Sequence, residues 1–113
     1  MAESTELLQG TLDLLILKAL SLGALNGYAV LLRIQQMSQD RLRIQQGSLY
    51  PALYRLEHQG LLKAEWGESE NRRKARIYRL TSAGRRRLQA ETDYWTRLST
   101  AIGLVLAVGA EEP

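Results

Sequence analysis

The C-terminal part of the chain predicts a helix that is longer than so small a protein can cover. Thr81 is a candidate N-cap for this helix, which starts near Ser82 and extends to about Ala107. The whole chain has 113 residues, enough for one domain and not for two. Apolar side chains recur along the helix in a heptad seam, which Glu91 interrupts. The seam residues are Leu88, Trp95, Leu98, Ile102 and Val105. We expect this seam to pair with a second copy of the chain; folding back onto the first helix is the alternative.

Two further helices are predicted in the N-terminal half. The first spans Thr11–Ser21, with Thr11 as its cap, and stops at Gly23. Apolar residues nearly encircle it, so it must be covered on several sides, by its own domain alone or together with a second subunit. The second runs from the cap Asn26 to about Met37. A turn follows, and then a short extended link over Arg41–Gln46.

A third helix is predicted between Ser48 and Gly60. Ser48 has the side chain of an N-cap, and Gly60 lies where a left-handed terminator belongs. Pro51 falls in the expected first turn, where its missing N–H would have no partner in any case. At 100° per residue the apolar residues share one side, which we expect to be buried. They are Leu49, Ala52, Leu53 and Leu56.

The opposite side of this third helix has an unusual composition. It carries Tyr50, Pro51, Tyr54 and His58, and Arg55 flanks them. A helix side that faces only solvent usually carries Lys, Glu and Gln instead. Outward aromatic rings beside a guanidinium therefore indicate contact with a partner.

Two alternating segments predict a β-hairpin after the third helix. Leu62–Trp66 and Lys74–Leu80 alternate as strands do, and the polar, partly basic segment Gly67–Arg73 joins them. Arg76, Tyr78 and Leu80 are expected on one side of the second strand.

The net charge of +3 comes entirely from the C-terminal half. Residues 1–60 hold five basic and five acidic residues, whereas residues 61–113 hold ten basic and seven acidic ones. No acid occurs in 71–90, and eight cations lie between Arg72 and Arg87. Such a run attracts polyanions; a basic face with no partner is the alternative.

The composition argues against an enzyme. The chain has no Cys and one His, which excludes disulfides, thiolate and multi-histidine metal sites and a cysteine nucleophile. No phosphate-binding loop is present, and the carboxylates Asp40 and Glu57 are isolated. We expect no catalytic site, no cofactor and no metal.

We also expect a cytoplasmic protein that does not enter a membrane. The segment Met1–Glu6 is acidic and polar, unlike the basic start of a signal peptide. No segment approaches the roughly 20 apolar residues that cross a bilayer. A disordered tail is expected only at 110–113.

The predicted order of three helices, a hairpin and a long helix is that of a winged helix-turn-helix protein. The fold class is mainly α with a small β-hairpin (α+β). We expect residues 1–80 to form the winged helix-turn-helix region and residues 81–113 to form the dimerisation helix and a short tail. The third helix would enter the major groove of DNA, and the hairpin would be the wing.

Three separated motifs resemble the PadR family of bacterial transcriptional regulators. The segment 47–57 reads Gly-Ser-Leu-Tyr-Pro-Ala-Leu-Tyr-Arg-Leu-Glu and is followed by Gly-Leu-Leu at 60–62, like the recognition-helix signature of that family. Leu-Lys-Ala-Leu at 17–20 and Asn-Gly-Tyr at 26–28 resemble its first two helices, where His-Gly-Tyr is more usual. The segment 73–84 resembles its second wing strand and last cap. The single C-terminal helix is similar to that of the small subfamily.

The resemblance implies a homodimeric repressor that binds a near-palindromic operator in double-stranded DNA and is released by a small molecule or another signal. Asn71, Arg72, Arg73 and Lys74 would contact phosphates or the minor groove, although Glu68 and Glu70 weaken attraction at the tip. Among the recognition-helix candidates, Ser48 and Tyr50 would contact phosphate, and Tyr54, Arg55 and His58 would face the major groove. For Arg55 an ion pair with a neighbouring acid is the alternative.

Two positions have roles that the sequence leaves open. Tyr28 would touch the DNA backbone or would be a core tyrosine with its hydroxyl at the rim. Trp95 would pack in the dimer seam, or would stack on a small aromatic effector between the subunits. A protein-interaction module, in which the basic face is incidental, is the competing function for the whole chain.

Overall fold

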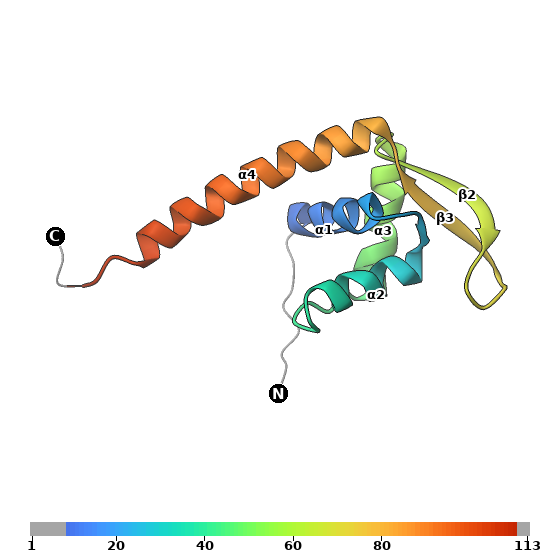
Figure 1. The fold of residues 1–113 in the computed structure, drawn as a ribbon, viewed down its shortest axis with the longest axis horizontal. Coiled ribbons are helices and arrows are strands. Elements are labelled where there is room, and N and C mark those ends of the chain that lie inside the picture. Colours follow the sequence, from blue (N-terminus) through green and yellow to red (C-terminus); the bar gives the residue numbers. More distant parts are fainter. Residues whose placement is uncertain (1–8, 111–113) are drawn as a thin grey trace.

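Helix α1 (Gln9–Ser21) lies at the centre of the molecule and contacts helices on several sides. A computed structural model describes residues 9–110, and Figure 1 shows their arrangement. Leu12, Ile16, Leu17, Ala19 and Leu20 of α1 are buried, as expected for a helix that is apolar nearly all round. The helix begins two residues before Thr11, so the prediction that Thr11 is its cap is wrong.

Helix α2 (Gly27–Met37) follows a short turn in which Gly23 adopts a φ of 141°. Its cap is Asn26, whose side-chain oxygen accepts a hydrogen bond from the Ala29 N–H at 3.0 Å. The predicted cap is therefore confirmed. Val30, Leu31 and Ile34 face the core.

Helix α3 (Gln46–His58) buries the four apolar residues that the sequence assigns to its inner side. It ends at a left-handed Gly60 with a φ of 77°, as predicted. The Gly60 N–H donates to the Glu57 carbonyl, and the Leu61 N–H donates to the Leu56 carbonyl. This hydrogen-bond pair is a Schellman motif, which requires a residue that tolerates positive φ.

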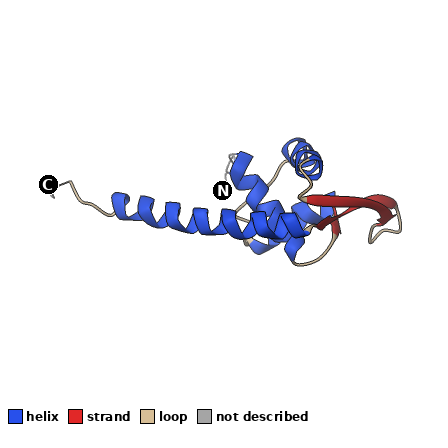
Figure 2. Ribbon diagram, turned by 90° about the horizontal axis from the view of Figure 1, so that it is seen from above, coloured by secondary structure: helices blue, strands red, loops and turns tan. Residues whose placement is uncertain are grey.

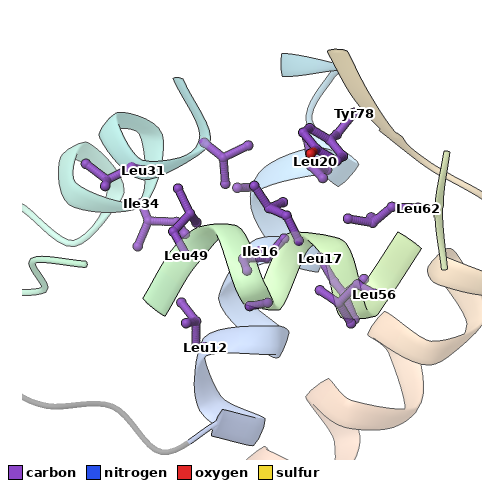
Figure 3. Packing of buried hydrophobic residues seen from close by; sticks show 14 of the residues in the cluster. Leu12, Ile16, Leu17, Leu20, Leu31, Ile34, Leu49, Leu56, Leu62 and Tyr78 are labelled. Atoms are coloured by element: carbon purple, nitrogen blue, oxygen red, sulfur yellow. The ribbon is translucent and has the colours of Figure 1, made fainter. Parts of the chain in front are cut away.

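The strands β2 (Leu62–Glu68) and β3 (Lys74–Leu80) form the predicted antiparallel hairpin. A third strand, β1 (Leu25–Asn26), pairs with β3 and completes a sheet of order β1-β3-β2. The sequence did not predict β1, because two residues are too few to show an alternating pattern. Figure 3 shows how Leu62 and Tyr78 of the sheet meet the leucines and isoleucines of α1, α2 and α3 in one core.

Helix α4 (Ser82–Leu106) projects from this core in the direction opposite to the β2–β3 hairpin (Figures 1 and 2). Its predicted cap is confirmed, because the Thr81 hydroxyl accepts a hydrogen bond from the Gly84 N–H at 3.0 Å. Gly84 is its only buried residue. The segment Met1–Glu6 and residues 111–113 of the predicted tail lie outside the described part of the chain.

Candidate nucleic-acid interface

The outer side of α3 is exposed, as its composition predicts. Tyr54 is the extreme case, with 71% of its surface accessible, and Tyr50 is also exposed. Ser48, Pro51 and His58 are exposed with them. The rings of Tyr54 and His58 lie one helical turn apart and stack, with centroids 6.3 Å apart and planes inclined by 17°. An aromatic surface therefore lies directly opposite the buried leucines.

The start of α3 differs from the prediction. The cap is Gln45, whose carbonyl accepts hydrogen bonds from the N–H groups of Ser48 and Leu49 at 3.0 Å, so Ser48 lies inside the first turn and is not the cap. Pro51 is consequently the sixth residue of the helix and not part of its first turn. Because proline has no N–H, the Gly47 carbonyl receives no helical hydrogen bond from position 51. This carbonyl lies at an exposed position, where water can bind it instead.

Tyr50 is held at a close approach between α2 and α3. A Cβ atom on Gly27, the first residue of α2, would lie 2.6 Å from Tyr50 Cε1. Only glycine leaves room for the ring at this distance. The neighbouring Tyr28 is half exposed at the start of α2, so it is not a core tyrosine.

Arg55 is turned away from the outer side of α3. Its Nη2 donates a hydrogen bond to Asp13 Oδ1 of α1, forming a half-buried ion pair. Within the described residues its buried Nε has no hydrogen-bond partner. Burial raises the pKa of Asp13 above its usual 3.8, against the opposing effect of the Arg55 charge. The ion pair with a neighbouring acid, one of the two interpretations of Arg55, is the arrangement that the structure shows.

The wing cations are exposed at the end of the hairpin. Asn71, Arg72, Arg73 and Lys74 are all exposed, and none of the three cations among them forms an ion pair within residues 9–110. A tight turn holds the tip, in which the Ser69 N–H donates to the Arg73 carbonyl and Arg72 adopts a φ of 58°. The wing cations are therefore free to meet a polyanion.

A second cluster on the wing was missed by sequence reasoning. Trp66 of β2 lies directly across from Arg76 of β3 and is 63% exposed. The Lys74 Nζ lies 5.1 Å, and the Arg76 guanidinium carbon 5.8 Å, from the centroid of its ring. Arg76 Nη2 also donates to Glu57 Oε2 of α3 at 2.6 Å. The cluster follows from the strand register, and the sequence alone does not fix that register. We call Glu57, Arg76, Trp66 and Lys74 the wing stack.

The seam on α4 is exposed except at its beginning. Leu88 is half-buried against the core of its own chain. Trp95, Leu98 and Ile102 are exposed, and Val105 is 72% exposed. Helix α4 contacts α1, so the alternative in which the seam folds back onto the first helix describes Leu88, whereas the seam residues beyond it are exposed in the single chain. Arg85, Arg86 and Arg87 at the start of α4 are exposed as well.

Neither a metal-binding cluster nor a membrane span is found among the described residues. Between residues 9 and 110 no three metal-binding side chains are grouped in a way that could hold an ion. In the same part of the chain no helix combines the length and the apolar character needed to cross a membrane. Burial also raises the pKa of Tyr78, which is a core residue.

Comparisons with known proteins agree with this geometry. The sequence model of the family described as "Transcriptional regulator PadR-like family" matches residues 16–90. A transcriptional regulator of Mycobacterium tuberculosis is 45% identical over 51 residues, which make up 45% of this chain and 47% of that protein. The matched segment thus spans about half the length of that relative.

Solved structures resemble the whole arrangement. A PadR family transcriptional regulator from Eggerthella lenta is 32% identical, with a TM-score of 0.74 over 89% of this chain and 86% of that one. A transcriptional regulator from Clostridium thermocellum is 27% identical, with a TM-score of 0.76 over 84% of this chain and 92% of that one.

Proposed function

Because the chain belongs to the PadR-like family of transcriptional regulators, we propose that it is a homodimeric repressor of a near-palindromic operator, released by a small molecule or another signal. Members of this family are regulators and not enzymes, which agrees with the expectation from composition. The observation that carries the proposal is the exposed aromatic side of α3 opposite its fully buried side. A regulator of this kind works in the cytoplasm, where the bacterial chromosome lies.

The recognition surface that we propose comprises Ser48, Tyr50, Pro51, Tyr54 and His58. Ser48 and Tyr50 lie in the first turns of α3, where the positive end of the helix dipole favours phosphate. Tyr54 and His58 would face base edges in the major groove. We leave Arg55 out of the base-reading set, because its guanidinium is bonded to Asp13. Tyr28 is a further candidate for contact with the DNA backbone.

The wing supplies the charge for this interface. Asn71, Arg72, Arg73 and Lys74 would bind phosphates beside the operator or reach into the minor groove. The exposure of these four side chains supports this role. Residues 1–80 would constitute the DNA-binding region of the proposed regulator.

Residues 81–113 would bring two such regions together. The exposed part of the seam is Trp95, Leu98, Ile102 and Val105, to which Leu88 adds the packed end nearest the core. Pairing of two such seams would place the recognition helices about one turn of DNA apart, roughly 34–36 Å. A flat aromatic effector would stack on Trp95 and lower operator affinity by favouring a different spacing.

The first test is fluorescence anisotropy of the protein on the DNA upstream of its own gene, beside a scrambled duplex, at about 150 mM salt. We expect specific binding to be about 10³-fold tighter than nonspecific binding. Equal weak binding to both duplexes by a folded dimer would contradict the proposed operator. Binding to neither would favour the protein-interaction module.

The salt dependence of binding tests the wing. We expect the triple variant Arg72→Ala, Arg73→Ala, Lys74→Ala to lower the slope of log affinity against log salt by about 2.7, which is 0.9 for each lost phosphate contact. The matched control is Lys63→Ala, an exposed cation near the base of the same hairpin. A triple variant with the full slope would show that the wing cations do not contact DNA.

A further inference from the structure

The outer half of the wing has little support from the sheet. Strand β1 pairs with β3 only at Tyr78 and Ile77, so the rows beyond Ile77 belong to a two-stranded ribbon. A two-stranded hairpin is marginally stable in water and twists easily. The three strand residues of the wing stack lie on these outer rows, where the pairs Trp66–Arg76 and Glu68–Lys74 share one face of the ribbon.

The contacts of the wing stack run from the recognition helix to the wing. Glu57 near the end of α3 accepts the hydrogen bond from Arg76, and the Arg76 guanidinium lies over the Trp66 ring. Lys74, the last cation of the wing tip, lies over the same ring. Each step therefore connects two different elements: α3 to β3, and β3 to β2.

The exposure of Trp66 shows that its ring is not part of the core. An indole that is 63% exposed gains little from burial, so packing does not explain its position. Two cations within 6 Å of its centroid are instead attracted by the negative face of the ring. Long Lys and Arg side chains lose much rotamer freedom when they bind a phosphate, and a ring that already orders them lowers this cost.

We propose that Trp66 is a positioning residue, whose ring holds Lys74 and Arg76 and, through Arg76 and Glu57, fixes the outer wing relative to α3. The wing and the recognition helix then meet DNA as one rigid unit. Lys74 has no ion-pair partner among the described residues and remains available to a phosphate, whereas the charge of Arg76 is offset by Glu57. This inference rests on the proposed DNA-binding function.

The test begins with the free protein, without DNA. In the NMR spectrum we expect the side-chain protons of Lys74 and Arg76 nearest their charges to be shifted upfield by the indole ring. Trp66→Leu should remove these shifts, and Trp66→Phe should keep part of them. Unshifted protons in the folded wild type would overturn the inference whatever the protein binds.

The second step measures affinity for the upstream duplex. We expect Trp66→Leu to bind about fivefold to tenfold more weakly and Trp66→Phe to recover part of the loss, because without the indole the two cations must be ordered when DNA binds and not before. In a background that carries Lys74→Met and Arg76→Met, Trp66→Leu should cause no further loss. In the matched background Lys63→Met, a cation of the same hairpin on its opposite face, the full loss should persist.

The outcomes separate this inference from the proposed function. An undiminished effect of Trp66→Leu without the two cations would mean that the indole itself touches DNA, and the positioning role would be wrong. The same conclusion follows if Trp66→Leu binds as the wild type does. A wild type that binds both duplexes alike would instead overturn the proposed function, while the NMR shifts would still establish the stack.

Discussion

The helix–sheet head and helix α4 differ in how much of their apolar surface is buried within their own chain. The head, formed by α1, α2, α3 and the sheet, buries a continuous apolar core drawn from all its elements except the wing tip. Helix α4 has 25 residues, of which Gly84 alone is buried, and its apolar side chains beyond Leu88 are exposed. The head can therefore be stabilised by its own chain, whereas the seam of α4 becomes useful only when a partner covers it.

The largest effect on the free energy of unfolding is expected from a substitution in the core of the head. Leu53 is fully buried, so Leu53→Ala should lower the free energy of unfolding by about 2–5 kcal/mol through lost burial and a residual cavity. Leu106→Ala is the control, because Leu106 is 77% exposed and should change stability by less than about 0.5 kcal/mol. Urea unfolding of both variants at low protein concentration measures the difference. Equal losses would mean that α4 is packed as tightly as the head.

A charge in the seam tests α4 itself. Ile102→Glu should weaken dimerisation at least about 100-fold, because a carboxylate would be desolvated in the interface. Leu104→Glu, roughly on the opposite side of the helix, should leave the dimer intact. Sedimentation over a range of concentrations distinguishes the two. Because monomers bind a single half-site, Ile102→Glu should also lose operator affinity, and a fully dimeric Ile102→Glu variant would refute the seam.

The third prediction concerns Gly84, where the start of α4 packs against the head. A Cβ on Gly84 would overlap the Leu61 carbonyl oxygen and lie 2.6 Å from Leu80 Cδ1. Gly84→Ala should therefore cost about 1–3 kcal/mol, because backbone cannot move aside as a flexible side chain does. Gly103 has open space around it, so Gly103→Ala should stabilise α4 by up to about 1 kcal/mol. Thermal unfolding measures both variants: the melting temperature should fall below that of the wild type for Gly84→Ala and rise above it for Gly103→Ala. A Gly84→Ala variant as stable as the wild type would show that the start of α4 is loosely packed against the head.

How far the sequence predicts this molecule depends on the range of the interaction. The caps Asn26 and Thr81 and the terminator Gly60 act within three or four residues, and all three were predicted correctly. The start of α3 was predicted wrongly, because its cap Gln45 makes no side-chain hydrogen bond and is not a residue type that indicates a helix start. The burial pattern of α3 followed from its 3.6-residue period alone.

Contacts between distant residues were beyond prediction. Asp13 and Arg55 are separated by 42 positions, and no local pattern relates them. Trp66 and Arg76 become neighbours only through the hairpin register, and Glu57 joins them through the packing of α3 against the sheet. The side chains on the exposed face of α3 were recognisable from their types, whereas the direction in which Arg55 turns was not.

The smallest effect concerns Asp13, which faces both regions. Its carboxylate pairs with Arg55 of the head, and the charges of Arg87 and Glu91 on α4 also influence its pKa. Because burial raises its folded-state pKa above 3.8, the folded protein binds this proton more tightly than the unfolded chain. Its contribution to stability is then complete below pH 3.8 and is lost as the pH rises through the folded-state pKa. Asp13→Asn should remove this decline, whereas the exposed Asp93→Asn should not. Urea unfolding in steps from pH 3.5 to 7 measures both, and a wild type that gains stability over Asp13→Asn as the pH rises would mean that the Arg55 ion pair outweighs burial.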